Sequence, residues 1–166
     1  MPDGRIDYSH ESQLEVVSVI RKYQPDNVIM NAPTDRHPDH GRASRVVEEA
    51  CFLSGLHKIV SKDGDTALEP WRPKTMYKYL QFYNLEPQVV VDISEGFEKK
   101  MASIKAHKSQ FFDPNSTEPE TVIASEGFFK SVIARAQDWG RVIGAAYAEP
   151  LISVRHIGLK NLEDLQ

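Results

Sequence analysis

The sequence predicts an α/β fold, a Rossmann-like three-layer sandwich with a mostly parallel sheet. Two observations support this prediction: segments with helical spacing of apolar residues alternate with short apolar runs, and a polar loop rich in histidine directly follows one of those runs. This alternation is typical of doubly wound proteins, whose ligands bind beyond the carboxyl ends of the strands. We expect residues 1–166 to form one domain, because their number is that of an ordinary single domain.

The individual elements are predicted from the spacing of apolar residues and from the turn residues around them. Helices carry an apolar residue every three or four positions, and strands are short apolar or alternating runs. In order, the predicted elements are a helix over 10–23, a buried strand over 27–31, a polar loop over 33–39, a helix over 40–56, an exposed loop over 61–73, strands over 75–83 and 88–93, a helix with Phe97, Met101 and Ile104 on its inner face and Ser94 as its N-cap, a polar connection over 112–119, and a helix over 121–146 with a kink at Gly140.

The composition is that of a globular protein and argues against several classes. The net charge is −4 and no block of Lys and Arg stands out, so we expect no nucleic-acid partner. No stretch approaches the roughly 20 apolar residues that span a bilayer, so no membrane partner is expected. The single cysteine, Cys51, falls on an apolar helical stripe and is expected to be a buried small residue. A lone cysteine and the absence of an apolar signal core at the N-terminus favour a cytoplasmic protein.

The chemistry of the chain centres on His37 and His40, three residues apart just beyond the strand over 27–31. A neutral imidazole is a good zinc ligand, a protonated one can donate to a developing oxyanion, and Asp39 supplies a carboxylate to orient one ring. The spacing leaves a second interpretation open, in which Asp39 caps the following helix and both histidines lie on a solvated loop. The other four histidines form no comparable cluster and are expected on the surface or in packing: His10, His57, His107 and His156.

At this loop the sequence resembles a known family. Asp35-Arg36-His37-Pro38-Asp39-His40-Gly41, after the strand over 27–31, resembles the second signature of the zinc-dependent LmbE and PIG-L family of N-acetylglucosaminyl deacetylases. The resemblance extends over nearly the whole chain and is strongest to the branch that deacetylates N-acetylglucosaminyl-malate in bacillithiol biosynthesis. The supporting segments are Met1-Pro2-Asp3-Gly4, Val46-Val47-Glu48-Glu49-Ala50, Val90-Val91-Asp92-Ile93-Ser94 with Lys99-Lys100, Ser109-Gln110-Phe111 and Tyr147-Ala148-Glu149.

The resemblance implies a role for each residue of the loop. His40 would be a zinc ligand, His37 would stabilise the oxyanion of the tetrahedral intermediate, and Asp39 would set the orientation and charge of His37. Arg36 is a candidate contact to an anionic substrate such as the malate aglycone, because its planar fork suits a carboxylate; the alternative is a surface salt bridge to Asp35 or another neighbour. Tyr147 is a further candidate substrate contact, with core packing as the alternative. The implied substrate is a small N-acetylated amino sugar.

One departure from the family affects every one of these roles. The family begins with a strand that ends in Ala-His-Pro-Asp-Asp and supplies two more zinc ligands and the general base, and these 166 residues contain no such segment. The resemblance therefore implies an N-terminally truncated member that lacks the first strand and helix and holds an incomplete Zn²⁺ site. We expect weak zinc binding and little or no deacetylase activity from the chain alone. Unpaired strand edges favour a homo-oligomer or an aggregation-prone product over a monomer.

Two alternatives from other classes stay open at this point. The chain is a non-catalytic α/β binding or oligomerisation module that keeps the family core, or it is a different hydrolase that uses His37 and Asp39 without a metal. The zinc content of the purified protein separates the zinc-dependent hydrolase from both alternatives.

Overall fold

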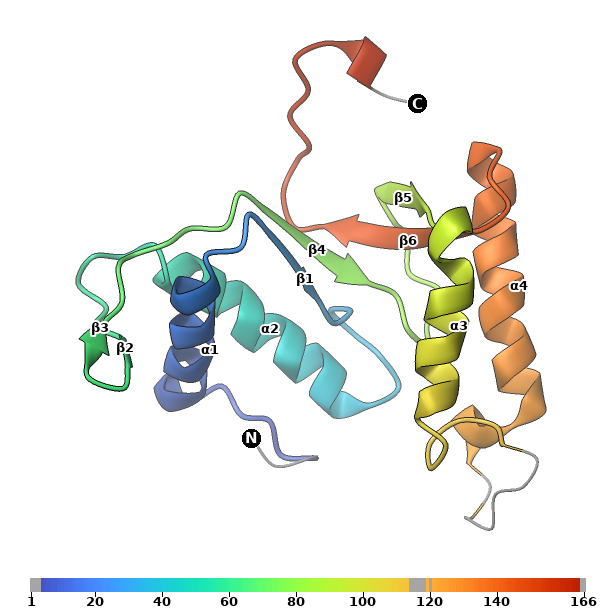
Figure 1. The fold of residues 1–166 in the computed structure, drawn as a ribbon, viewed down its shortest axis with the longest axis horizontal. Coiled ribbons are helices and arrows are strands. Elements are labelled where there is room, and N and C mark those ends of the chain that lie inside the picture. The colour runs from blue at the N-terminus through green and yellow to red at the C-terminus, as the bar shows by residue number, and fades with distance from the viewer. Residues whose placement is uncertain (1–3, 114–118, 120, 165–166) are drawn as a thin grey trace. The chain divides into compact units, whose positions relative to one another are not determined.

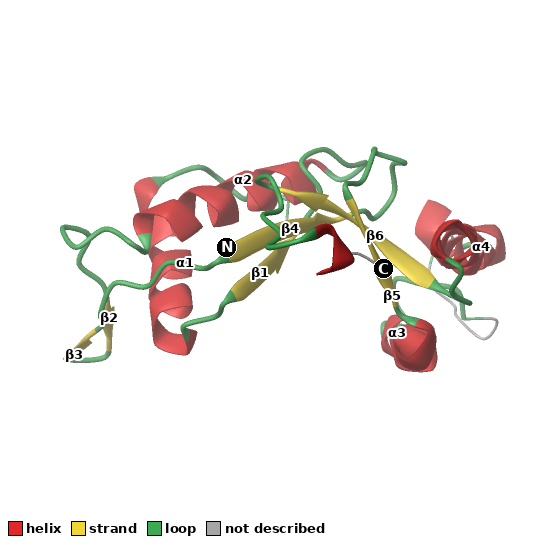
Figure 2. Ribbon diagram, turned by 90° about the horizontal axis from the view of Figure 1, so that it is seen from above, coloured by secondary structure: helices red, strands yellow, loops and turns green. Residues whose placement is uncertain are grey.

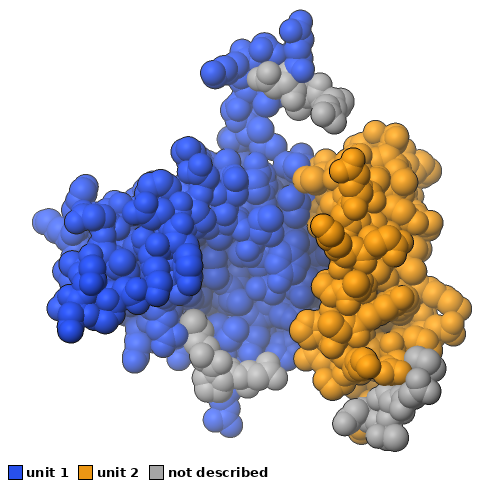
Figure 3. Space-filling model, viewed as in Figure 1, with its two compact units in different colours: residues 1–89, 151–166 blue, residues 90–150 orange. Residues whose placement is uncertain are grey.

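The computed structural model of the chain describes residues 4–113, 119 and 121–164, and these fall into two compact units. Unit 1 comprises residues 1–89 and 151–166, and unit 2 comprises residues 90–150 (Figure 3). Each unit has its own cluster of buried apolar side chains. The expectation of one domain over residues 1–166 stays a prediction.

Unit 1 contains two helices beside a small sheet (Figure 1). Its elements are α1 (His10–Tyr23), β1 (Asn27–Met30), α2 (Pro38–Leu53), a hairpin of β2 (Lys62–Asp63) and β3 (Thr66–Ala67), β4 (Thr75–Tyr79), the last residues of β6 (Ala148–Ser153), and a short 3₁₀ helix, η3 (Leu162–Asp164). β1 pairs in parallel with β4, with Asn27 opposite Thr75, and β4 pairs antiparallel with β6, with Tyr79 opposite Leu151.

The core of unit 1 lies where α1 and α2 pack against each other. Val17 and Ile20 of α1 and Ala50 and Cys51 of α2 are buried there, and the partly buried Val28, Ile59, Trp71 and Met76 pack onto them. The Nε1–H of Trp71 donates to the carbonyl of Pro25 at 2.8 Å. On β1, Met30 is buried but Ile29 is 61% exposed. The described residues therefore cover only one face of a strand whose apolar sequence predicts burial on both.

Unit 2 is built around two helices (Figures 1 and 2). β5 (Val89–Asp92) leads into it, followed by the 3₁₀ helix η1 (Ser94–Gly96), α3 (Phe97–Ala106), the 3₁₀ helix η2 (Val122–Ala124) and α4 (Glu126–Ile143). Phe97 and Met101 of α3 and Ala136 of α4 form its buried cluster. The backbone N–H of Ile93, just after β5, donates to the carbonyl of Tyr147, just before β6, at 3.0 Å.

The α/β class is confirmed, with a parallel β1–β4 pair and an antiparallel strand, β6, beside it. The helix over 10–23 has the predicted bounds, and the Ser9 hydroxyl caps it by accepting from the Ser12 N–H. Cys51 is buried as predicted, and burial raises the pKa of its thiol to about 11. Within the described part of the chain, no helix combines the length and the apolar character that a bilayer crossing needs.

Four details differ from the sequence-based expectation. The exposed loop over 61–73 contains the β2–β3 hairpin, with Gly64 in the left-handed region (φ 60°). Ser94 is no N-cap, because its hydroxyl bonds with Asp92 and with the backbone of Tyr147. The last helix runs over α4 alone, from the Ser125 cap to Gly144. β6 has no counterpart among the predicted strands.

Gly140 lies inside α4, and the predicted kink there stays a prediction. A Cβ at this position would lie 2.7 Å from the carbonyl oxygen of Ala145, so the glycine leaves room for the chain to fold back onto the helix. Two other expectations lie outside the described residues in part: the connection over 112–119 includes 114–118, and the segment Met1 to Gly4 includes residues 1–3.

Candidate functional site

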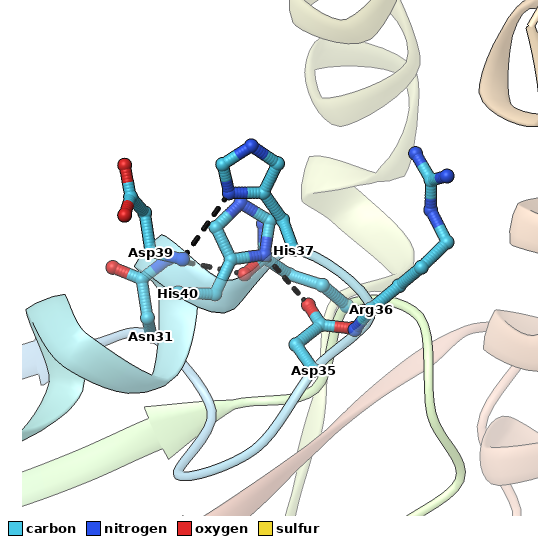
Figure 4. Close-up of polar contacts among 7 residues, drawn as sticks. Asn31, Asp35, Arg36, His37, Asp39 and His40 are labelled. Atoms are coloured by element: carbon cyan, nitrogen blue, oxygen red, sulfur yellow. Dashed lines mark hydrogen bonds and ion pairs between the residues drawn. The ribbon is translucent and has the colours of Figure 1, made fainter. Parts of the chain in front are cut away.

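His37 is the residue on which α2 begins. Its backbone is extended (φ −84°, ψ 124°), Pro38 occupies the first turn, and the His37 ring accepts a hydrogen bond at Nδ1 from the Asp39 N–H at 3.2 Å (Figure 4). This is an N-cap contact, made by an imidazole in place of the usual hydroxyl or carboxylate. The alternative in which Asp39 caps the helix is therefore wrong, because the side chain of His37 does so.

This cap also determines where His37 carries its proton. A nitrogen that accepts from an N–H has no hydrogen of its own, so the neutral ring holds its proton on Nε2. The side chain thus has a donor at the end that faces away from the helix backbone.

His40 lies one turn into α2 and has a different partner. Its Nδ1 lies 2.8 Å from Oδ2 of Asp35, whose other oxygen accepts the backbone N–H of Arg36 at 2.7 Å (Figure 4). The two histidine rings are near each other, with centroids 5.3 Å apart. Burial raises the pKa of Tyr79, and the negative charge of Asp35 adds to this effect.

Asp39 is buried, but its carboxylate contacts neither histidine. Oδ1 accepts from the Arg42 guanidinium at 3.0 Å, and Oδ2 has no hydrogen-bond partner among the described residues. Burial acts to raise the pKa of this carboxyl, but the hydrogen bond from Arg42 and the backbone N–H groups of Gly4 and Ile6 outweigh it and lower the pKa. In this structure Asp39 acts on His37 through its backbone N–H, whereas the sequence suggested its carboxylate.

The remaining candidates lie in different surroundings. Arg36 is exposed and extends away from the two rings (Figure 4), with its guanidinium carbon 5.4 Å from the centre of the Phe82 ring. It has no ion pair within the described residues, so the predicted alternative of a salt bridge to Asp35 is absent there. Tyr147 belongs to unit 2, where its ring stacks on Phe97 at 3.6 Å; its role at a substrate stays a prediction.

A cavity of about 700 Å³ borders the loop, and Asp35, His37, Arg42, Ser44 and Lys78 are among its lining residues. The loop approaches α2 closely here, since a Cβ on Gly41 would lie 2.9 Å from the carbonyl oxygen of Pro33. The hydroxyl of Ser44 is buried without a hydrogen-bond partner in the described chain. The cavity therefore gives access to the His37 side of the loop, and its charges are mixed.

The described residues do not by themselves fit a catalytic zinc. Such a site takes three protein ligands and keeps one position open, and in this part of the chain no three His, Cys, Asp or Glu side chains come together as a metal-binding group. What the loop provides is one ring, His40, whose Nδ1 is occupied by a carboxylate and whose Nε2 is left for another partner.

Sequence reasoning missed Asp35. It treated this residue as part of the motif and as a possible partner of Arg36, although a carboxylate five residues before a histidine at the start of a helix is a candidate for orienting that ring. The side chain of Asp35 is 1% exposed. A carboxylate this well buried next to an imidazole indicates a specific contact, because burying a charge without a partner is costly.

Known proteins resemble this chain in sequence and in fold. Residues 1–51 match the PIG-L family, described as GlcNAc-PI de-N-acetylase. Diacetylchitobiose deacetylase from Thermococcus kodakarensis is 32% identical over 151 residues, which cover 89% of this chain and 52% of that protein. Residues 1–51 of this chain are thus similar to the PIG-L family. The chain spans about half the length of the curated relative that it matches.

Solved structures share the fold. The conserved protein TT1542 from Thermus thermophilus has a TM-score of 0.82 at 27% identity, over 98% of this chain and 66% of that one. N,N'-diacetylchitobiose deacetylase from Pyrococcus horikoshii, complexed with its inhibitor MPG, has a TM-score of 0.71 at 27% identity, over 99% of this chain and 60% of that one. GalB, the 4-carboxy-2-hydroxymuconate hydratase from Pseudomonas putida KT2440, has a TM-score of 0.69 at 19% identity, over 93% and 62% of the two chains, and shows the fold alone.

Proposed function

We propose that this chain carries part of the active site of a hydrolase that removes the acetyl group from an N-acetylglucosaminyl conjugate. The observation that supports this most directly is the pair of histidines at the start of α2, each held by a different polar partner. The relatives add to it, since two of them are named as deacetylases of diacetylchitobiose.

His37 would act on the acetyl carbonyl. Attack by water on the carbonyl carbon places negative charge on the carbonyl oxygen, and the Nε2–H of His37 donates a hydrogen bond to that oxygen. The cap at Nδ1 holds the ring and its proton in place before the substrate arrives, so little reorganisation is needed. Collapse of the tetrahedral intermediate then breaks the C–N bond, and a proton from the attacking water passes to the leaving nitrogen, which gives acetate and a free amine on the sugar.

Zinc is the proposed cofactor, with His40 Nε2 as one ligand. When bound, a zinc ion lowers the pKa of a coordinated water and polarises a carbonyl. One ligand does not make a site, so we expect the 166-residue chain to bind zinc weakly.

The identity of the sugar conjugate is a further proposal. The sequence resemblance favours N-acetylglucosaminyl-malate, the substrate of the bacillithiol branch, over diacetylchitobiose. Arg36 supports an anionic substrate, because it is exposed and has no ion pair in the described chain. A guanidinium can bind a carboxylate through two parallel hydrogen bonds. Substituting Arg36 by Gln should therefore weaken binding of the malate conjugate while leaving neutral diacetylchitobiose unaffected.

The test measures acetate release by the purified chain from N-acetylglucosaminyl-malate and from diacetylchitobiose, with and without added Zn²⁺. We expect little acetate release from the chain alone, and any release should require zinc. His37→Asn should reduce it by about 100-fold or more, to the background, because an oxyanion donor contributes that much. His57→Asn, an exposed histidine in the same unit, serves as the matched control and should leave release unchanged.

Two results would contradict the proposal. His37→Asn with the activity of the parent chain would exclude His37 from the reaction. No acetate release under any condition, together with no change in the His37 ring resonances on adding either substrate, would favour the non-catalytic module.

A further inference from the structure

The cavity of about 700 Å³ beside α2 lies in unit 1, to which all of its lining residues belong. They come from α2 itself, from the segment before α1, from the loop before His37 and from β4. Small-molecule sites have volumes of roughly 300–1,000 Å³ and are lined mainly by apolar side chains. This cavity has the volume of such a site, but charged and hydroxyl-bearing side chains make up most of its wall. The ligand that it suits is therefore hydrophilic.

The charged side chains of this cavity balance one another. Nε of Arg45 donates to Oε1 of Glu49 at 2.9 Å, and Nζ of Lys78 donates to Oε2 of Glu48 at 2.5 Å. The lining holds three cations and three carboxylates: Arg42, Arg45 and Lys78, and Asp35, Glu48 and Glu49. A charged ligand would meet as many like charges as opposite ones, and like charges brought together cost free energy. The wall therefore favours a ligand without net charge.

The ion pairs leave hydrogen-bonding positions that a neutral ligand can use. A guanidinium carries several N–H donors and a carboxylate several acceptor positions, and the Arg45–Glu49 contact occupies Nε on one side and Oε1 on the other. A hydroxyl group both donates and accepts, so the hydroxyls of a ligand can bind both members of such a pair without separating them.

Two further side chains of the lining favour a sugar. The ring of Tyr8 lies beside Arg45, whose guanidinium carbon is 4.9 Å from the ring centre, and Tyr8 remains 46% exposed. An exposed aromatic ring offers an apolar surface on which the C–H face of a pyranose can pack. The hydroxyl of Ser44 is buried and has no hydrogen-bond partner in the described chain. A buried hydroxyl without a partner costs free energy, so the wall favours a polar neighbour that the described residues do not supply.

We propose that this cavity is a saccharide-binding site for a neutral pyranose ring, with Tyr8 as the stacking surface and the Arg45–Glu49 pair as the group that binds ring hydroxyls. The site selects by charge balance: it accepts the neutral ring and rejects the same ring with an ammonium or a carboxylate group. Because His37 also lines the cavity, a ring bound here lies beside the proposed oxyanion donor. That this ring belongs to the substrate rests on the proposed function, whereas the binding itself does not require the reaction.

The test uses three sugars with the same ring size: neutral N-acetylglucosamine, glucosamine with its ammonium group, and glucuronate with its carboxylate. Each is titrated into the chain at a pH of about 7, where the amine is mostly protonated and the carboxylate is ionised. Backbone amide and Tyr8 ring resonances are followed by NMR. We expect saturable shifts at Tyr8, Ser44 and Arg45 with a Kd of roughly 1–10 mM for N-acetylglucosamine. Both charged sugars should bind about tenfold more weakly.

Two substitutions within one ion pair should change this selection in opposite directions. Glu49→Gln leaves the charge of Arg45 unbalanced, so glucuronate should bind at least as tightly as N-acetylglucosamine. Arg45→Gln leaves the charge of Glu49 unbalanced, so glucosamine should gain in the same way. The two side chains are 66% and 38% exposed, and an exposed ion pair contributes little to stability, so both variants should fold. A merely structural role of the pair would not reverse the preferred charge.

Glu126→Gln is the matched control, because Glu126 forms an exposed ion pair with Lys130 one turn away in α4 of unit 2. It should leave all three affinities unchanged. Three results would overturn the proposal. They are the absence of shifts at Tyr8 and α2 with N-acetylglucosamine up to about 50 mM, equal affinities for the three sugars, and a preferred charge that neither Glu49→Gln nor Arg45→Gln alters.

None of these results depends on acetate release. A chain that binds N-acetylglucosamine as expected and releases no acetate would refute the proposed function and leave the saccharide site intact. Acetate release from a chain whose Tyr8 and α2 resonances do not respond to any of the three sugars would do the reverse.

Discussion

At its C-terminal end, α2 is followed by a buried cation: the guanidinium of Arg21, in a side chain 2% exposed, donates to the carbonyls of Ser54, Leu56 and Ile59 at 2.7–2.9 Å. At its N-terminal end, the same helix is capped by the imidazole of His37, and Oδ2 of the buried Asp39 has no hydrogen-bond partner in the described chain. At the C-terminal end, backbone carbonyls are bound by a side chain with almost no exposed surface. At the N-terminal end, imidazole nitrogens and charged groups remain available to a ligand.

The two ends of α2 thus contribute differently, one to stability and the other to chemistry. Backbone carbonyls removed from water cost free energy without a partner, and Arg21 of α1 donates to the carbonyl of the C-cap residue Ser54 and to two carbonyls in the segment that follows α2. The N-terminal end of α2 holds the groups that a reaction needs, at some expense of local stability. Substitutions at the C-terminal end should therefore lower the free energy of unfolding without specific effects on the histidines, and substitutions at the N-terminal end should affect the histidines with a smaller loss of stability.

The largest effect is expected from Arg21→Met. The substitution retains an apolar stem and removes every donor, so the carbonyls of Ser54, Leu56 and Ile59 each lose a hydrogen bond from a charged group, at about 1.5–3 kcal/mol per bond. We expect a loss of roughly 3 kcal/mol or more in the free energy of unfolding, measured by urea denaturation, with the parent ring resonances of His37 and His40 in the folded fraction. A chain as stable as the parent would show that the C-terminal end is not where stability resides.

Gly41→Ala should have the next largest effect. The added Cβ would lie 2.9 Å from the Pro33 carbonyl oxygen, so the loop that carries Asp35 must move. We expect destabilisation of about 1–2 kcal/mol, as for a crowded contact, and a shifted His40 resonance. Gly127→Ala in α4 is the control, because a Cβ there would meet no atom within 4 Å and alanine favours a helix. Equal effects of the two substitutions would rule out the close approach as the cause.

His37 provides two substitutions that separate capping from chemistry. His37→Ala removes the cap and should cost about 1 kcal/mol in the free energy of unfolding. His37→Asn retains a side-chain acceptor for the Asp39 N–H and should have nearly parent stability. Both lose the Nε2–H and should release no acetate above background. Equal stability of the two variants in urea would mean that the ring contact contributes nothing to the helix.

The smallest effect concerns a third helix end, the start of α1. The side chain of Ser9, the Ser9 N–H at 2.9 Å and the Ser12 hydroxyl at 2.8 Å all stabilise the charged Asp7 carboxylate and lower its pKa to about 2. Because the folded-state pKa is below the ordinary 3.8, the stabilisation is complete above pH 3.8 and is lost as the pH falls toward about 2. Asp7→Asn should remove this part of the acid dependence. Identical acid titrations of the two chains, followed by circular dichroism, would contradict this.

Local patterns were enough to predict most of unit 1. The helix over 10–23 is bounded by a serine cap and followed by a proline, and both act within a few residues, so its bounds could be predicted. β6 could not, because Pro150 interrupts its short apolar run and its partner β4 lies far earlier in the chain, with Tyr79 opposite Leu151. In unit 2, the bounds of α4 depend on a cap at Ser125 and a left-handed Gly144, which the apolar stripe alone does not mark.

The candidate site shows the same division. The two histidines could be found from their spacing, since both belong to one loop and one helix turn. Their partners could not. Asp39 had both His37 and Arg42 within reach, and its carboxylate pairs with Arg42. Asp35 reaches His40 only because the loop turns back on itself between them, a matter of backbone conformation that residue spacing does not determine.

The positions of the two tryptophans have a consequence for fluorescence measurements. The chain has two tryptophans, and each compact unit contains one: Trp71 beside the core of unit 1, and Trp139 in α4 of unit 2. Trp71→Phe and Trp139→Phe therefore each leave a fluorophore that reports the unfolding of a single unit. Coincident emission transitions in urea would make the 166 residues one cooperative domain, and separate midpoints would make them two.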